Sequence, residues 1–293
     1  MKRLQPSTFS IVAFDPASQC WGVAVESKFL AVGPVVAWAR AGAGAVATQA
    51  FANTGYGPQG LKLLAAGLSA KAVVEKLTQQ DDGQDHRQLG VVDANGHSAS
   101  FTGKACYDWA GHRTGTGYAC QGNMLAGATV VDDMAKAFEA NSGRPLAQRL
   151  IGALQAGQAT GGDKRGQQSA ALLVVKDKGG YGGYTDQLVD LRVDDHPQPI
   201  AELNRLYALQ QLYFGQTTET VPLQGQLLQN VQTMLKQLGY YQAQPRPQLD
   251  EATRNALDAF CGTENLEMRQ GKDPGLLDVE ILRFLQKLAG QNA

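Results

Sequence analysis

The sequence predicts an α+β fold, a four-layer α-β-β-α sandwich followed by a small all-α domain of three helices. The first observation is the order of expected elements: strands, two helices, strands, two helices, strands and a helix. The second is that most connections are tight and hairpin-like, unlike the alternation of a doubly wound sheet. The third is that most of the 34 glycines precede Gly215, whereas the remaining chain is rich in Gln and Leu.

Two strands separated by a turn begin the first domain. An apolar, β-branched run starts at Thr8 and breaks at Asp15-Pro16, and a second apolar run follows, which is the pattern of a β-hairpin. Turn residues, hydrophobic periodicity and N-cap residues such as Ser69 define the later elements. The expected strands are 8–14, 21–27, 44–50, 88–93, 97–102, 118–121, 169–175 and 188–193, and the expected helices are 58–66, 70–79, 129–141, 145–156 and 200–214.

The last part of the chain has the pattern of a small helical domain. We expect Gly239 to end one helix and Asp250 to cap the next. The expected helices are 227–238, 251–260 and 276–288. The expected domain bounds are 1–7 for an N-terminal extension, 8–215 for the sandwich, 216–223 for a polar linker and 224–293 for the helical domain.

Composition restricts the classes of function. The 293 residues are 43% hydrophobic and 18% charged, as in soluble globular proteins, and the net charge of -1 argues against nucleic-acid binding. No apolar run approaches the roughly 20 residues that span a bilayer, and 1–7 has no apolar core of a signal peptide, so we expect a cytoplasmic protein. Four cysteines without a Cys-x-x-Cys spacing disfavour structural zinc, and a Cys106–Cys120 bridge stays open.

Thr8 is the first candidate for catalysis because it stands at the head of a buried strand. Removal of 1–7 would give Thr8 a free α-amine, which could act as general base for the adjacent hydroxyl. Glu26 and Lys28 end the next strand and share a face by alternation, and Arg40 ends a later apolar segment. Either cation could lower the pKa of the nucleophile, although an exposed ion pair is the simpler reading.

Three polar clusters flanked by glycine follow along the chain. Gln121-Gly122-Asn123 precedes a helix and could supply oxyanion donors, or it is an ordinary strand-to-helix turn. Asp163-Lys164-Arg165 lies in a glycine-rich loop that could bind a carboxylate, or it is a solvated loop. His112 is the best placed histidine, although a structural histidine is more common. A metal site of His112, Asp194, Asp195 and His196 is a weaker idea than an N-terminal cap at 194–197.

Together these motifs resemble the domain-of-unknown-function family 1028, which is placed among the N-terminal-nucleophile (Ntn) hydrolases. The resemblance covers about 8–215 and rests on ordered segments of this sequence. Those segments are Thr8-Phe9-Ser10-Ile11-Val12-Ala13, Gly22-Val23-Ala24-Val25-Glu26-Ser27-Lys28-Phe29, Trp38-Ala39-Arg40-Ala41-Gly42, Ala47-Thr48-Gln49-Ala50, Tyr56-Gly57-Pro58, Gln121-Gly122-Asn123-Met124-Leu125 and Gly161-Gly162-Asp163-Lys164-Arg165-Gly166.

The resemblance implies an Ntn-type sandwich with Thr8 as nucleophile and 121–124 near the oxyanion site. It also implies a basic residue beside the nucleophile, roughly at Arg40. Many members carry Met directly before this Thr, whereas here Thr8 follows 1–7. Either 1–7 is clipped, the start is misassigned, or Thr8 is not a nucleophile.

The C-terminal domain is similar to peptidoglycan-binding three-helix modules. The similarity rests on 231–241, 249–254 and 256–260, whereas the usual Asp-Gly-x-Phe-Gly turn is replaced by 242–248. This departure leaves two readings, a glycan-binding module and a helical module for dimerisation or docking. Binding to the cell wall would require that the protein is located in the cell envelope.

The favoured function is an Ntn-type amidohydrolase acting on a small amide, ureido or peptide-like substrate without a cofactor. Thr8 is the expected nucleophile, with Arg40 and Asn123 as catalytic partners. The alternative is an inactive sandwich that binds a ligand or partner and docks through its helical module; a homodimer is expected in either case. The expected substrate-binding residues are Glu26, Lys28, Gln121, Gly122, His112, Asp163, Lys164 and Arg165.

Overall fold

The computed structural model describes residues 8–290, so the expected extension 1–7 lies outside the described residues. Contacts divide the chain into two compact units, residues 1–206 and 207–293, and each unit is described by itself. The expected mixture of helices and several sheets is confirmed, and so is a helical region at the C-terminal end. None of the helices in the described part combines the length and apolar character that crossing a bilayer requires.

The larger sheet of the first unit has six strands, and all neighbouring strands are antiparallel. The first hairpin is confirmed, and its turn is held by Asp15 Oδ2, which accepts a hydrogen bond from the Ser18 backbone N–H at 3.2 Å. In spatial order the strands are β10 (Gln187–Val193), β9 (Ser169–Val175), β2 (Cys20–Ser27), β1 (Thr8–Asp15), β8 (Tyr118–Asn123) and β7 (Gly111–Gly115).

Strand β7 lies where the sequence predicted only a polar cluster. Its residues are exposed or half-buried, and it forms one edge of the larger sheet. An edge strand of this kind needs no apolar alternation, because neither of its faces is deeply buried. The segment 33–36, expected within an apolar run, is instead the short helix α1 (Gly33–Val36) with Pro34 in its first turn.

The smaller sheet has four antiparallel strands in chain order. Its expected hairpin is confirmed. Asp93 Oδ1 accepts the backbone N–H groups of Asn95 at 2.9 Å and His97 at 3.0 Å, and Gly96 takes φ +82°, which favours glycine. The strands are β3 (Ala37–Arg40), β4 (Gly44–Ala50), β5 (Arg87–Asp93) and β6 (Ser98–Thr102).

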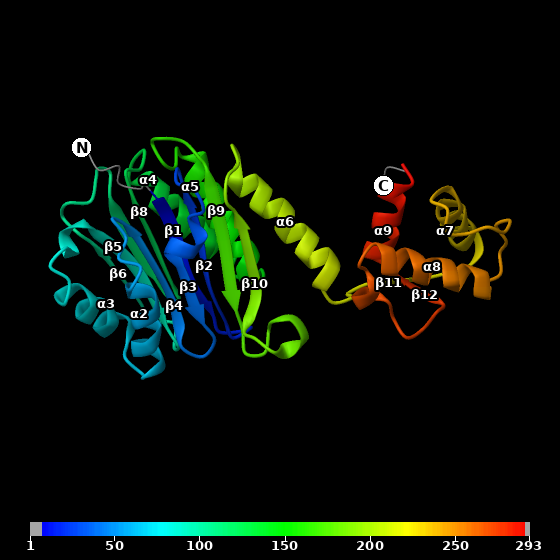
Figure 1. Ribbon diagram of the computed structural model, residues 1–293, viewed down its shortest axis with the longest axis horizontal. Coiled ribbons are helices and arrows are strands. Elements are labelled where there is room, and N and C mark those ends of the chain that lie inside the picture. The colour runs from blue at the N-terminus through cyan, green and yellow to red at the C-terminus, as the bar shows by residue number, and fades with distance from the viewer. Residues whose placement is uncertain (1–7, 291–293) are drawn as a thin grey trace. The chain divides into compact units, whose positions relative to one another are not determined.

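The two sheets pack against each other through one apolar core. Val12 and Phe14 of β1 meet Ala45 and Ala47 of β4 there, and Trp21 of β2 lies in the same core. Because strand side chains alternate, the even-numbered residues of β1 and the odd-numbered residues of β2 face the smaller sheet. This assignment places Thr8 on the inner face. Figure 1 shows the strands of the two sheets lying in facing layers.

Helices cover the outer face of each sheet. Helices α4 (Thr129–Ala140) and α5 (Leu146–Ala159) pack on the larger sheet. Gly22 has no side chain, which makes room for Leu150, because a Cβ there would lie 2.7 Å from the Leu150 Cδ1 atom. Helices α2 (Tyr56–Ala65) and α3 (Ala70–Gln79) pack on the smaller sheet. Ser69 caps α3 as predicted, because its Oγ accepts the Ala72 N–H at 3.4 Å.

The second unit contains three helices and a small sheet that the sequence did not predict. Residues 276–278, expected as the start of a helix, form β12 (Leu276–Asp278), which pairs with β11 (Thr220–Pro222). Asp278 then caps the last helix by accepting the Glu280 N–H at 2.6 Å. The expected cap at Asp250 is confirmed. The helices are α7 (Gly225–Gln237), α8 (Glu251–Thr263) and α9 (Val279–Leu288); α6 (Pro199–Phe214) spans the boundary between the units, and 3₁₀ turns cover 84–86, 181–183 and 267–269.

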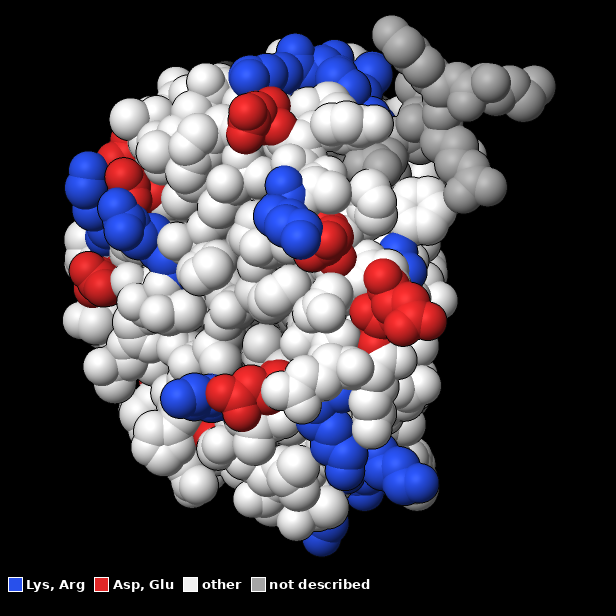
Figure 2. All heavy atoms as spheres, turned by 90° about the vertical axis from the view of Figure 1, so that its left-hand side faces the viewer, with Lys and Arg blue, Asp and Glu red and all other residues white. Residues whose placement is uncertain are grey.

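The charged surface mixes both signs. On the face that Figure 2 shows, Lys and Arg side chains lie in small groups next to Asp and Glu, and uncharged residues separate these groups. The net charge of -1 agrees with this mixture.

Candidate functional site

Thr8 begins β1 and lies between strands of its own sheet. It pairs with Asn123 of β8 in the antiparallel register, so the two side chains share the inner face of the sheet. Its hydroxyl donates a hydrogen bond to the Ser27 Oγ of β2 at 3.1 Å. Thr8 is 1% exposed and Asn123 2%. A hydroxyl and an amide from neighbouring strands are therefore held side by side between the two sheets.

Five buried neutral side chains extend from this point into the space between the sheets. We call them the inter-sheet cluster: Ser10, Gln49, Gln88, Gln121 and Asn123, each at most 2% exposed. Buried polar groups cost free energy unless they are hydrogen-bonded. The cluster is accordingly connected by hydrogen bonds that cross from one sheet to the other.

Gln88 of β5 makes the most contacts in the cluster. Its Oε1 accepts hydrogen bonds from Gln49 Nε2 at 2.8 Å and from Asn123 Nδ2 at 3.0 Å. Its Nε2 lies within hydrogen-bond distance of the Gly122 carbonyl at 2.8 Å and of the Thr102 Oγ1 atom at 3.0 Å. Gln88 therefore fixes the orientation of the amide that lies opposite Thr8.

Ser10 and Gln49 connect the cluster to the start of β1. Ser10 Oγ donates to Gln49 Oε1 at 2.5 Å and accepts from Gln121 Nε2 at 2.7 Å. Gln49 Nε2 also lies 3.3 Å from the Thr8 carbonyl oxygen. Gly90 leaves room for this packing, since a Cβ there would lie 2.0 Å from Gln121 Oε1. That oxygen has no hydrogen-bond partner among the described residues.

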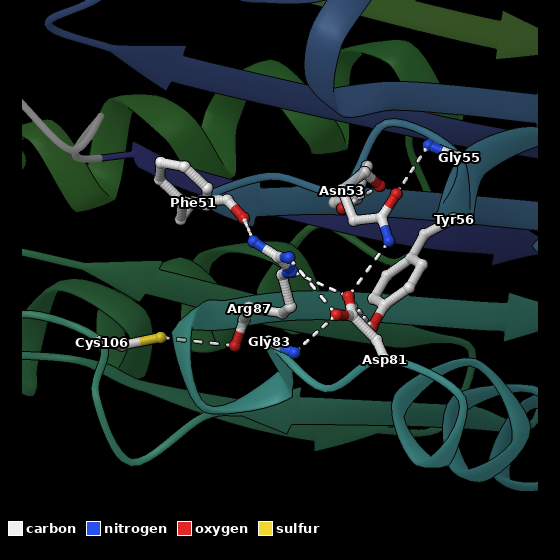
Figure 3. A network of polar contacts seen from close by, with 9 residues as sticks. Phe51, Asn53, Gly55, Tyr56, Asp81, Gly83, Arg87 and Cys106 are labelled. Carbon is white, nitrogen blue, oxygen red and sulfur yellow. Dashed lines mark hydrogen bonds and ion pairs between the residues drawn. The ribbon is translucent and has the colours of Figure 1, made fainter. Parts of the chain in front are cut away.

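A second polar network fixes the ends of the strands that carry Gln49 and Gln88 (Figure 3). Asp81 accepts hydrogen bonds from Asn53 Nδ2 at 3.0 Å, Tyr56 OH at 2.9 Å and Arg87 Nε at 2.8 Å. The Arg87 guanidinium is the main reason why the pKa of Asp81 lies well below its usual value. Arg87 also donates to the Phe51 carbonyl at 2.6 Å, which ties the end of β4 to the start of β5.

The loop 161–166 lies beside the end of β8, so the structure brings two of the three predicted clusters together. The Lys164 N–H donates to the Met124 carbonyl at 3.1 Å, and the Ala126 N–H donates to the Gly162 carbonyl at 3.0 Å. Asp163 is buried and accepts hydrogen bonds from the Lys28 backbone N–H at 2.9 Å and the Arg165 Nη2 at 3.0 Å. Asp163 is thus a structural anchor for this loop.

The exposed ammonium groups at this end of the sheet come from Lys28 and Lys164. Lys28 Nζ donates to the Gln167 carbonyl at 3.1 Å, and Lys164 Nζ donates to the Asp108 carbonyl at 3.2 Å. Each ammonium therefore donates a hydrogen bond to a neutral carbonyl oxygen rather than to a carboxylate. Two positive charges lie on segments that adjoin the strand ends of Thr8 and Asn123.

Glu26 does not face Thr8. It pairs with Phe9, so it lies on the helix-covered face of the sheet, whereas its neighbour Ser27 takes the place next to the Thr8 hydroxyl. Its side chain is buried, and neither carboxyl oxygen has a hydrogen-bond partner among the described residues. Burial is the main reason why the pKa of Glu26 lies well above its usual value, and the nearby Asp163 carboxylate adds to the shift.

Replacing Glu26 by glutamine is expected to stabilise the protein at neutral pH. A raised folded-state pKa means that, as pH rises above the unfolded pKa of about 4.3, the unfolded state ionises while the folded state stays protonated, so stability falls. Glu26→Gln removes this loss and should raise the free energy of unfolding near pH 7 by about 1–2 kcal/mol. Denaturant unfolding at pH 4 and pH 7 measures the difference.

The matched control is Glu75→Gln, since Glu75 lies on the surface of α3 and pairs only weakly with Lys71. It should change stability little at either pH. Equal stability curves for Glu26→Gln and the unchanged protein would contradict a raised pKa of Glu26.

Two other predicted site residues lie away from Thr8. Arg40 is exposed and pairs with Gly44, at the end of β4 opposite to Gln49, about 17 Å along the strand. The sequence could not foresee this, because it does not fix which end of β4 meets β1. His112 is exposed on edge strand β7, and its Nδ1 lies 2.9 Å from Thr102 Oγ1, which connects it to the cluster through Gln88.

The structure does not bring the weaker metal set together. Asp194, Asp195 and His196 follow β10 at one edge of the larger sheet, and His112 lies on β7 at the opposite edge. Residues 8–290 contain no group of three or more His, Cys, Asp or Glu side chains that could hold a metal ion. All four cysteines are buried free thiols, so Cys106 and Cys120 form no bridge.

The backbone after β8 corrects one detail of the expected oxyanion site. The N–H groups of Met124 and Leu125 donate to the carbonyls of Tyr107 at 2.9 Å and Trp109 at 3.0 Å, and the Ala126 N–H is also bound. These donors hold the connecting loops and are occupied. Of the side chains predicted here, Gln121 and Asn123 both lie on the Thr8 face, and Asn123 is the one directly opposite Thr8.

The sequence did not predict Ser10, Ser27, Gln49 or Gln88 as site residues. A signal existed, since Gln49 and Gln88 each interrupt a strand of small or apolar residues. A long polar side chain in such a strand predicts a buried hydrogen-bonding partner. The partners themselves come from distant strands and could not be named.

Comparison with known proteins matches two regions of the chain to two families. Residues 8–203 match a family described as "Family of unknown function (DUF1028)", and residues 213–285 match one described as "Putative peptidoglycan binding domain". The crystal structure of protein SPO2555 from Silicibacter pomeroyi, assigned to DUF1028, is 34% identical with a TM-score of 0.63 and covers 70% of this chain and 89% of its own. No curated protein matches the chain.

Proposed function

The chain belongs to DUF1028, a family of unknown function, through residues 8–203, and on that premise we propose that its first unit is an amide hydrolase of the N-terminal-nucleophile type. The observation that carries the proposal is the position of Thr8, at the start of a central strand, with its hydroxyl directed to the inner face beside Asn123. Two facing sheets with helices on their outer faces support an α-β-β-α sandwich of this type.

The proposed reaction uses the α-amine of Thr8 as the general base. Once 1–7 are removed, this amine accepts the hydroxyl proton while Oγ1 attacks the amide carbonyl carbon. The proton then passes to the leaving nitrogen as the C–N bond breaks, and an ester on Thr8 remains. Water attacks this ester and gives a proton to the amine. The bond between the acyl carbon and Oγ1 then breaks, the amine returns the proton to Oγ1, and the carboxylic acid is released.

The neighbouring residues act in this scheme through position and charge. The Asn123 amide lies where it can donate to the oxyanion of the tetrahedral intermediate, and Gln88 orients that amide. Because both groups are neutral and buried, their dipoles need little reorganisation during the reaction. Ser27 accepts the Thr8 hydrogen bond in the resting state and so orients Oγ1.

The proposed substrate is a small amide or ureido compound that carries a carboxylate, or a peptide-like equivalent. The cationic side chains of Lys28 and Lys164 lie on the segments next to the strand ends of Thr8 and Asn123. Such charges attract and orient an anionic group without taking part in bond breaking.

The N-terminal residue of the active protein tests this proposal. Active protein purified from its natural source should begin at Thr8, because an amide nitrogen at this position cannot accept a proton. N-terminal sequencing together with intact mass measures the start. A homogeneous, fully active protein that begins at Met1 would exclude the proposed role of Thr8.

The second unit favours a second candidate function, binding to cell-wall glycan. Its match to a peptidoglycan-binding family is the observation that supports this role. Retention of the full chain on purified peptidoglycan would support a place in the cell envelope. No retention would leave the helical module as a docking or dimerisation element, and with it the alternative of a cytoplasmic protein whose sandwich only binds a ligand.

A further inference from the structure

The second unit contains a pocket of about 300 Å³, which we call the α8–α9 pocket. Helix α8, the loop 270–274, strand β12 and the first turn of α9 line it. Five buried apolar residues contribute to its lining, and most of its polar residues are exposed. The apolar residues are Leu223, Leu257, Cys261, Leu277 and Ile281, the exposed polar residues are Arg254, Asp258, Gln270, Lys272 and Asp273, and the buried polar residues are Arg269 and Asp278.

The acidic groups of the pocket are already engaged. Asp258 Oδ1 accepts a hydrogen bond from Gln270 Nε2 at 2.8 Å, and Asp273 Oδ1 accepts one from the Gly275 backbone N–H at 2.8 Å. Asp278 forms a buried ion pair with Arg269 at 3.0 Å. These contacts hold the loop and the start of α9, and they leave the acids little capacity for a ligand.

The two remaining cationic side chains of the pocket, unlike its acids, have no hydrogen-bond or ion-pair partner among the described residues. Arg254 and Lys272 are exposed, and within residues 8–290 neither side chain forms a hydrogen bond or an ion pair. A guanidinium and an ammonium without partners therefore stand beside buried apolar side chains. This combination favours a ligand that has an apolar body and a negative end.

We propose that the α8–α9 pocket binds a small carboxylate with an apolar body, such as the free carboxyl end of an acylated amino acid or short peptide. Arg254 holds the carboxylate, because its planar donors match both oxygens, and Lys272 adds a second positive charge. Leu257 and Ile281 contact the apolar body. A neutral glycan has no negative group that could pair with these cations.

Binding is observable in the full chain through its isoleucines. The sequence has four, of which Ile281 lines the pocket, whereas Ile11, Ile151 and Ile200 belong to the first unit. Titration of methyl-labelled protein with N-acetyl-leucine should shift the Ile281 signal saturably, with a dissociation constant of about 1 mM, as expected for a ligand of this size. The three other isoleucine signals should stay in place.

Charge variants separate this site from non-specific binding. Arg254→Gln should weaken binding about tenfold, because a charge-assisted contact is lost. Lys287→Gln is the matched control, since Lys287 is exposed on α9 and does not line the pocket. N-acetyl-leucinamide, which has no charge, should bind as weakly as the acid binds to the Arg254→Gln protein.

Three results would overturn the proposal. They are the absence of a saturable Ile281 shift up to 20-fold above about 1 mM, equal binding of the acid and the amide, and equal affinity of Arg254→Gln and Lys287→Gln. A chitin-type oligosaccharide that shifts the Ile281 signal and binds the Arg254→Gln protein with unchanged affinity would likewise overturn the proposal and assign the pocket to glycan. None of these results depends on hydrolysis by the first unit.

Discussion

Replacing Thr8 by alanine, in a chain that begins at this residue, is expected to lower kcat/KM for small amides by about 10³-fold or more. The reason is that the substitution removes the atom that attacks the carbonyl, while the fold loses only the hydrogen bond to Ser27. A panel of N-acyl and N-carbamoyl amino acids, followed by release of the free amine or acid, provides the measurement.

Thr8→Ser is the matched variant because it retains the hydroxyl and the α-amine. It should keep activity within about tenfold of the unchanged protein, since only a methyl group is lost. Thermal unfolding of both variants should stay close to that of the unchanged protein. Turnover by Thr8→Ala at the original rate, with the fold intact, would mean that another residue performs the chemistry.

Replacing Gln88 by alanine is expected to cost about 3–5 kcal/mol of folding free energy. The truncation removes the Gln88 acceptor from the side-chain amides of Gln49 and Asn123, and it removes the Gln88 donor from the Gly122 carbonyl and the Thr102 hydroxyl. Each unpaired buried group costs about 1–3 kcal/mol, and the space left by the side chain adds to the loss.

Tryptophan fluorescence measures this effect in the first unit alone, because all three tryptophans, Trp21, Trp38 and Trp109, lie there. The midpoint of thermal unfolding should fall by about 10 °C. Gln79→Ala is the control, since this glutamine is exposed at the end of α3 and should change the midpoint little. A similar small change for both variants would show that the cluster contributes no net stability.

The elements that the sequence predicted correctly are those whose signals come from a few neighbouring residues. The first hairpin follows from a β-branched run and an Asp-Pro turn, and the caps at Ser69 and Asp250 follow from the chemistry of helix N-termini. The strand 276–278 was missed because three residues before a strong helical pattern carry no separate periodicity.

The site was only partly predictable, because it depends on pairings between distant strands. Asn123 lies opposite Thr8 through the register of β1 with β8, and no local pattern encodes that register. The face of the sheet on which the Glu26 side chain lies could not be predicted either. Both faces of β2 are apolar and buried, so alternation alone does not say whether Glu26 or Ser27 meets the nucleophile. The position of Arg40 could be predicted only if the direction of β4 relative to β1 were known.

The central claim is that Thr8 becomes a nucleophile when its nitrogen is a free amine. The most direct measurement is the intact mass of the protein after reaction with a β-lactone, which acylates an activated hydroxyl by ring opening. A chain beginning at Thr8 should gain one lactone, located on Thr8 by fragmentation, whereas the Thr8→Ala chain should gain none. An unmodified mass, or a lactone attached elsewhere in both chains, would contradict the claim.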